Sequence, residues 1–187
     1  MIDNLIKKTR SYRRFDATRA VTEEEFLKMV EGARCSGSSA NRQRIRFALV
    51  NDRDGCDKIF QNVAFAGYLK DWSGPAENER PTAYLALMCK EETIDTSLAI
   101  DIGIAAQSML LCATEMGLGG CMIRSFKKEN VDKILGKEGY NTALVIALGK
   151  PTERVYLTDV IDGDIKYFRD ENDDHAVPKL SLEELII

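Results

Sequence analysis

Apolar residues recur at helical spacing in several stretches of the chain, and short runs rich in apolar residues lie between them. In residues 22–34 the apolar positions have helical spacing, and Thr22 and Glu25 at the start of this stretch are placed to form a capping box. This stretch is expected to be a helix, and shorter helices are expected at residues 54–65 and 126–135. The apolar runs predict strands, the first of them buried, at residues 46–50, 82–88, 120–123 and 143–148.

The longest predicted helix covers residues 96–116 and is apolar around most of its circumference. Such a helix is buried on several sides, so in a chain of this length it is expected to be central and partly covered by a second subunit. Its polar residues Asp101, Gln107 and Glu115 argue against a membrane span. Gly117 is placed to end the helix.

Helices and strands alternate along the chain, which predicts an α+β or α/β layered fold. The 187 residues contain no repeat or clear linker, so residues 1–187 are expected to form a single domain. The tail after residue 151 is mainly polar, and Ser181 with Glu184 forms a second predicted capping box.

The composition argues against several classes of function. A net charge of −4 argues against a general nucleic-acid or membrane-surface binder. His175 is the single histidine, which excludes a histidine pair and a histidine-rich metal site, so no metal is expected. Residues 1–15 contain no long apolar segment, so no signal peptide is expected and the protein is expected in the cytoplasm. Five cysteines without a C-x-x-C pair predict reduced, mostly buried thiols at positions Cys35, Cys56, Cys89, Cys112 and Cys121.

One segment of this acidic protein is strongly basic: five of the nine residues from Lys7 to Phe15 are lysine or arginine. Arginine binds phosphate well because its planar guanidinium donates two charge-assisted hydrogen bonds at once. The segment is therefore a candidate anion site. A solvated basic arm is the plainer alternative, and a nucleic-acid-binding module is a third.

Two further segments carry small or polar residues. Residues 36–46, after the first predicted helix, combine glycine and serine with asparagine and glutamine, which suits the edge of a planar ligand or an ordinary helix-to-strand loop. The run Gly117-Leu-Gly-Gly-Cys-Met-Ile123 follows a helix and is not a G-x-G-x-x-G fingerprint. A Rossmann dinucleotide site is therefore disfavoured.

Taken in order along the chain, these segments resemble the nitroreductase family of FMN enzymes. That family has an R-R-S-x-R-x-F signature, a serine-rich loop, a central helix leading into G-L-G, an A-L-G-x-P segment and a basic V-P-K-R end. The matching runs here are Thr9-Arg-Ser-Tyr-Arg-Arg-Phe15, Gly37-Ser-Ser-Ala-Asn-Arg-Gln43, Gly117 to Ile123, Ala147-Leu-Gly-Lys-Pro151 and Val177-Pro-Lys-Leu180. Thr9, Gly37 and Leu180 depart from the pattern, and these changes bear on the affinity for FMN.

The resemblance implies roles for individual residues. Arg10 and Lys179 would hold the FMN phosphate, and Ser11 would position the ribityl–phosphate end. Arg13 would lie near N1 and O2 of the flavin ring and tune it. Two groups of polar residues would complete the site: a loop that meets the flavin across a dimer interface or at its pyrimidine edge, and a pair that presents backbone groups to N5 and O4. These are Ser38, Ser39, Asn41 and Gln43 for the loop, and Arg124 and Ser125 for the pair.

The resemblance also implies a central mixed sheet flanked by helices, in an intertwined homodimer with two sites at its interface. The expected activity is NAD(P)H-dependent reduction of a small organic acceptor, such as a nitroaromatic or a quinone, by a ping-pong mechanism. The cofactor would carry the chemistry, so no protein nucleophile is expected. The alternatives are a flavin-binding protein without turnover, reductive dehalogenation and flavin fragmentation. Trp72 is expected either to stack on a substrate or to pack internally.

Overall fold

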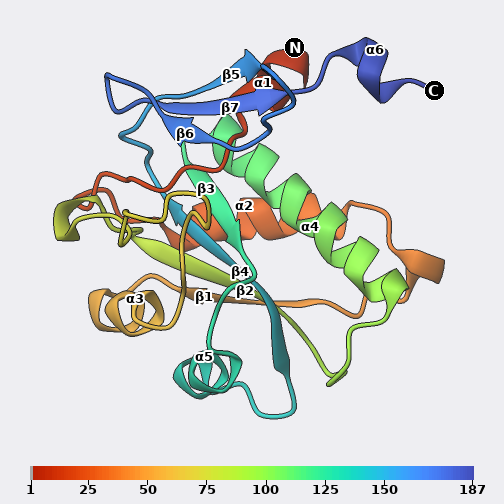
Figure 1. Ribbon diagram of the computed structural model, residues 1–187. Coiled ribbons are helices and arrows are strands. Elements are labelled where there is room, and N and C mark those ends of the chain that lie inside the picture. The colour runs from red at the N-terminus through yellow and green to blue at the C-terminus, as the bar shows by residue number, and fades with distance from the viewer. Residues whose placement is uncertain (1) are drawn as a thin grey trace.

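The computed structural model describes residues 2–187, and a four-stranded sheet lies at its centre (Figure 1). The strand order is β1-β2-β4-β3, and each neighbouring pair is antiparallel. The predicted α+β class is confirmed, but this sheet is not mixed; the structure places parallel strand pairing in a second sheet. The four strands are β1 (Arg46–Val50), β2 (Ala83–Cys89), β3 (Gly119–Ile123) and β4 (Asn141–Gly149).

Helices cover both faces of the sheet, so the molecule has three layers (Figure 1). Because side chains alternate along a strand, Leu85 and Leu87 of β2 pack toward one face while Tyr84 packs toward the other. The leucine face is covered by α2 (Glu23–Arg34) and α4 (Thr96–Glu115), and the tyrosine face by α3 (Arg53–Phe60) and α5 (Lys128–Leu135).

The elements begin and end where local chemistry predicts. Thr22 and Glu25 form the predicted capping box of α2. Gly117 follows α4 with a φ of +76°, a left-handed conformation that favours glycine. Helix α3 is shorter than predicted, since it ends at Phe60. Strand β1 lies at the edge of the sheet and is only half-buried, so the prediction of a buried strand was wrong there.

Helix α4 is long and apolar enough to cross a membrane by length and composition alone. Here one side of it packs against α2 and the sheet, with Ala106 and Met109 fully buried. Its opposite side leaves Ile100 and Ile104 exposed at 55% and 39%. The helix is therefore the core helix of this domain, with one apolar strip left uncovered in the single chain.

The tail was predicted only as a polar segment with one helix start, but it forms a second sheet. This sheet has the order β5-β7-β6, with β5 and β7 parallel. It lies beside both ends of the chain (Figure 1). Helix α6 begins at the predicted capping box of Ser181 and Glu184. The elements at the two ends of the chain are α1 (Ile2–Lys8), β5 (Val155–Asp159), β6 (Phe168–Arg169), β7 (His175–Lys179) and α6 (Leu182–Leu185).

Candidate functional site

The basic segment predicted from sequence lies along β3. Ser11 forms a parallel β-bridge with Gly120, and the backbone N–H of Tyr12 donates to the Gly120 carbonyl oxygen at 3.1 Å. A Cβ on Gly119 would lie 2.5 Å from the Tyr12 ring, and one on Gly120 would lie 2.5 Å from the Ala147 carbonyl oxygen. Gly119 therefore allows the basic segment to approach β3 closely, and Gly120 allows β3 to lie close to β4. We call residues 9–15 the basic arm.

A buried carboxylate fixes the far end of the arm. Glu153 accepts hydrogen bonds from the backbone N–H groups of Arg13 and Arg14, the latter at 3.1 Å. Its other oxygen lies 2.7 Å from Nη2 of Arg169, and the Glu153 side chain is only 2% exposed. Phe15, fully buried, forms a β-bridge with Pro151. The backbone of the arm is thus held on both sides of Arg13.

The arm forms one wall of a cavity of about 310 Å3, which we call the arm cavity. Strand β7 supplies another wall, because His175, Val177 and Lys179 alternate onto one face of that strand. Arg10 and Lys179, from opposite ends of the chain, thereby line the same cavity. The complete lining is Thr9, Arg10, Ser11, Arg13, Gln107, Leu110, Met122, Tyr167, His175, Val177 and Lys179.

The cations of the arm cavity have no carboxylate partners. Within residues 2–187, the side chains of Arg10, Arg13 and Lys179 form no ion pair. Arg10 instead donates to backbone carbonyl oxygens of Thr9 at 2.7 Å and Ile6 at 3.1 Å. Three positive charges around one cavity, none of them neutralised, favour an anionic ligand.

Arg13 lies at the buried end of the arm cavity, between a histidine and a tyrosine. Its Nη1 donates to the Ser11 carbonyl oxygen at 3.1 Å and lies 3.1 Å from Nε2 of His175. Its guanidinium carbon lies 4.8 Å from the centre of the Tyr167 ring. Burial, and next the charge of Arg13, lower the pKa of His175 to about 4. The imidazole is therefore neutral near pH 7.

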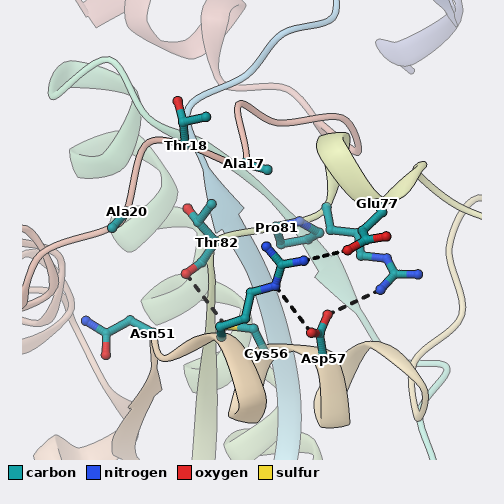
Figure 2. A pocket seen from close by; sticks show the side chains of 11 residues that line it. Ala17, Thr18, Ala20, Asn51, Cys56, Asp57, Glu77, Pro81 and Thr82 are labelled. Atoms are coloured by element: carbon teal, nitrogen blue, oxygen red, sulfur yellow. Dashed lines mark hydrogen bonds and ion pairs between the residues drawn. The ribbon is translucent and has the colours of Figure 1, made fainter.

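A second cavity, of about 180 Å3, also contains two arginines, and we call it the paired-charge cavity. Asp57 and Glu77 turn toward the guanidinium groups there (Figure 2), with Arg53 Nη2 2.7 Å from Glu77 and Arg80 Nη1 3.2 Å from Asp57. Burial raises the pKa of the Cys56 thiol to about 12, so it is not a thiolate nucleophile. The lining is Ala17, Thr18, Ala20, Asn51, Arg53, Cys56, Asp57, Glu77, Arg80, Pro81 and Thr82.

The serine-rich loop does not reach the arm cavity within one chain. Ser39 donates through its backbone N–H and its hydroxyl to Oδ1 of Asp101, at 2.8 and 2.9 Å, near the start of α4. The arm cavity touches α4 further along, at Gln107 and Leu110. The loop backbone is strained, because Ala40, Asn41 and Gln43 have φ values of +49°, +52° and +48°. The four loop candidates, Ser38, Ser39, Asn41 and Gln43, thus lie together but apart from the arm.

Arg124 and Ser125 follow the end of β3 and are exposed. The Ser125 carbonyl oxygen accepts a hydrogen bond from the N–H of Ala64 at 2.8 Å, and neither residue lines the arm cavity. Seven cavity residues were not among the sequence candidates, and two of these, Tyr167 and His175, contact Arg13. The spacing of His175 from Lys179, four residues along one strand, could have indicated that both face the same ligand.

The comparison with known families covers the arm, the loop and the core helix. The sequence model of the nitroreductase family matches residues 6–150. The chain belongs to the nitroreductase family. The matched range contains most of the predicted motifs, while β7 and Lys179 lie beyond it.

Individual nitroreductases agree with this assignment. A Bacillus subtilis protein provisionally named as an NAD(P)H nitroreductase is 23% identical, over 81% of this chain and 89% of its own length. A nitroreductase family protein of Clostridium novyi has a TM-score of 0.67 at 21% identity, covering 81% of this chain and 86% of its own. An FMN-dependent nitroreductase of Clostridium difficile has a TM-score of 0.67 at 22% identity, covering 91% and 99%. The nitroreductase fold is therefore shared.

Proposed function

We propose that this protein is an FMN-dependent oxidoreductase that transfers electrons from NAD(P)H to a small organic acceptor, such as a nitroaromatic or a quinone. The arm cavity carries the proposal, because its cations are not neutralised and come from the segments that the nitroreductase resemblance assigns to FMN. Two relatives are named for the same chemistry, one as FMN-dependent and one for NAD(P)H.

The arm cavity suits FMN in charge and size. Arg10 and Lys179 would hold the single terminal phosphate, and Ser11 would bind the adjoining ribityl end. The volume of about 310 Å3 lies at the lower end of the range for small-molecule sites, about 300–1,000 Å3. No glycine fingerprint for a pyrophosphate occurs in the sequence, which favours FMN over FAD.

When bound, FMN supplies hydride acceptance and donation at its N5 atom. The chain's own contribution is to bind, orient and polarise. Glu153 and the β3 glycines fix the arm backbone, so Arg13 presents a buried positive charge at one end of the cavity. This charge would tune the flavin ring. No protein nucleophile is required in this proposal, and Cys56 remains a thiol.

The proposed active unit is a homodimer in which the serine-rich loop of one protomer meets the flavin of the other. Two observations support it: the loop lies away from the arm cavity of its own chain, and Ile100 and Ile104 form an exposed apolar strip on α4. In the same proposal, the backbone groups of Arg124 and Ser125 would contact the flavin. Light scattering tests it with Ile104→Glu, which is expected to yield monomers that bind FMN poorly. A stable wild-type monomer that binds FMN stoichiometrically would contradict it.

The function is tested first by the cofactor and then by turnover. Purified protein is expected to be yellow and to release FMN, identified by mass, and anaerobic NAD(P)H is expected to bleach it. Reoxidation by a panel of nitroaromatics and quinones would then identify the acceptor class. Protein that stays colourless and takes up no added FMN would overturn the proposal. Protein that binds FMN without bleaching would be a flavin-binding protein without turnover.

A further inference from the structure

His175 is the single histidine of the chain and is almost completely buried, at 1% exposure, in the wall of the arm cavity. Its Nε2 lies 3.1 Å from Nη1 of Arg13. Its other ring nitrogen, Nδ1, is buried and has no hydrogen-bond partner within residues 2–187. The contact with Arg13 is thus the one side-chain hydrogen bond that the imidazole makes in the part of the chain described here.

The chemistry of the pair fixes which group donates. A guanidinium has only donors and stays protonated, so Arg13 donates and His175 Nε2 must accept with its lone pair. The imidazole is therefore neutral, with its proton on Nδ1. The charged groups around it agree, because Arg13, Arg14 and Arg169 outweigh the single carboxylate Glu153 in disfavouring an imidazolium.

A neutral acceptor has a consequence that a carboxylate would not have. Glu153, the buried carboxylate nearby, is occupied by the backbone N–H groups of Arg13 and Arg14 and by the Arg169 side chain. The guanidinium of Arg13 is instead held by His175, the Ser11 carbonyl oxygen and the face of Tyr167. All three are uncharged. Arg13 is therefore fixed in place while its full positive charge remains available to the cavity.

We propose that His175 is the positioning residue of Arg13, orienting its guanidinium toward the FMN in the arm cavity without neutralising its charge. This inference rests on the proposed FMN-dependent function. It assigns no proton transfer to His175, since Arg13 occupies its acceptor nitrogen.

Three substitutions separate the position of Arg13 from its charge. His175→Gln keeps a neutral acceptor, His175→Leu removes the acceptor, and His175→Glu adds a carboxylate that would ionise beside Arg13. Val155→Ala, on the neighbouring β5 rung that pairs with His175, is the control for disturbing the second sheet. FMN affinity is measured by quenching of FMN fluorescence, and the flavin midpoint potential by anaerobic spectroelectrochemistry.

We expect His175→Leu to weaken FMN binding by about 5- to 30-fold, which corresponds to ~1–2 kcal/mol. His175→Gln is expected to restore most of this affinity and to keep the wild-type midpoint potential. His175→Glu is expected to bind FMN with a midpoint potential as low as that of Arg13→Gln. In the Arg13→Ala background, His175→Leu should cause no further loss of affinity, because the two residues act as one unit.

The outcomes distinguish this inference from the proposed function. A wild-type protein that binds no FMN would overturn both. If the wild type binds FMN and His175→Leu binds it with the same affinity, the role of His175 alone is overturned. The same conclusion follows if His175→Leu lowers the FMN affinity equally in the wild-type and Arg13→Ala backgrounds. If His175→Leu does not fold, His175→Gln and His175→Glu decide the matter, and equal midpoint potentials in those two variants would contradict the proposal.

Discussion

The arm cavity and the paired-charge cavity are both lined by arginines, and they differ in which groups lie beside the guanidinium groups. In the paired-charge cavity, Arg53 and Arg80 face Asp57 and Glu77. In the arm cavity, Arg10 and Arg13 face backbone carbonyl oxygens and a neutral imidazole. A guanidinium that already forms an ion pair attracts a further anion only weakly. A cation without a carboxylate partner is stabilised when an anionic ligand binds beside it. The partners of an arginine, more than its presence, therefore indicate a ligand site.

The largest expected effect comes from removing the cations that are proposed to bind the FMN phosphate. Arg10→Ala and Lys179→Ala should each weaken FMN binding by about 10- to 150-fold, because a hydrogen bond to a charged group contributes ~1.5–3 kcal/mol. Arg80→Ala, in the paired-charge cavity, is the matched control and should leave FMN affinity unchanged. Fluorescence titration measures all three. Unchanged affinity in both arm-cavity variants would mean that the phosphate binds elsewhere.

Acid should destabilise the folded protein, because protonating His175 would add a buried cation where Arg13, Arg14 and Arg169 outweigh the single nearby carboxylate, Glu153. The pKa of His175 is about 4 in the folded protein against an ordinary value of 6.5, so between these pH values the unfolded state binds more protons. Stability is thus lost as the pH falls from 6.5 toward 4, by up to roughly 3 kcal/mol.

Urea unfolding of wild type and His175→Gln at pH 7 and pH 4 measures this loss. The glutamine variant cannot titrate at this position, so the pH-dependent contributions of the carboxylates to the free energy of unfolding cancel when the two proteins are compared. A stability difference between the two proteins that stays constant from pH 7 to pH 4 would rule out the buried neutral imidazole.

A smaller effect is expected for the charge at the flavin ring. Arg13→Gln removes a cation whose interaction with reduced flavin we place at ~1–2 kcal/mol, so the midpoint potential should fall by about 20–40 mV with FMN still bound. Arg14→Gln is the neighbouring control, since Arg14 pairs with Asp173 and does not line the cavity. Spectroelectrochemical titration decides the case, and an unshifted potential in Arg13→Gln would leave Arg13 without a role at the ring.

The smallest effect belongs to the paired-charge cavity itself. Arg80→Gln and Asp57→Asn should each change the free energy of unfolding by less than about 1 kcal/mol, because both side chains are about one-third exposed and screened by solvent. Chemical unfolding measures this. If Arg80→Gln instead weakened FMN binding as strongly as Arg10→Ala, this would contradict the proposal that only the arm cavity binds FMN.

Most elements from residue 22 to residue 149 could be predicted, because their signals are local. The capping box at Thr22, the apolar run of β2 and the glycine after α4 each act within a few residues of where they stand. The second sheet could not be predicted in this way. Strand β6 has only two residues and no residue of β5 is buried, so no periodic apolar signal marks these two strands.

The candidate site likewise contains residues that the sequence could indicate and residues whose roles depend on distant contacts. Arg10, Ser11, Arg13 and Lys179 do meet in one cavity, as the family resemblance implied, although their contact with FMN stays a prediction. The role of His175 depends on a contact between residues 162 positions apart, which no local pattern reveals. The serine-rich loop could not be placed against the flavin at all, since the contact proposed for it involves a second chain.

The bridge between Ser11 and Gly120 has a consequence for how this chain can change. Along the arm, Ser11 and Arg13 line the cavity, while Tyr12 and Arg14 do not. An insertion of one residue between Ser11 and Tyr12 would exchange these two sets beyond the bridge, turning Tyr12 inward and Arg13 outward. Side chains in the arm can therefore be replaced one at a time with graded effects, whereas a single-codon insertion there would turn the cation proposed to face the flavin out of the cavity.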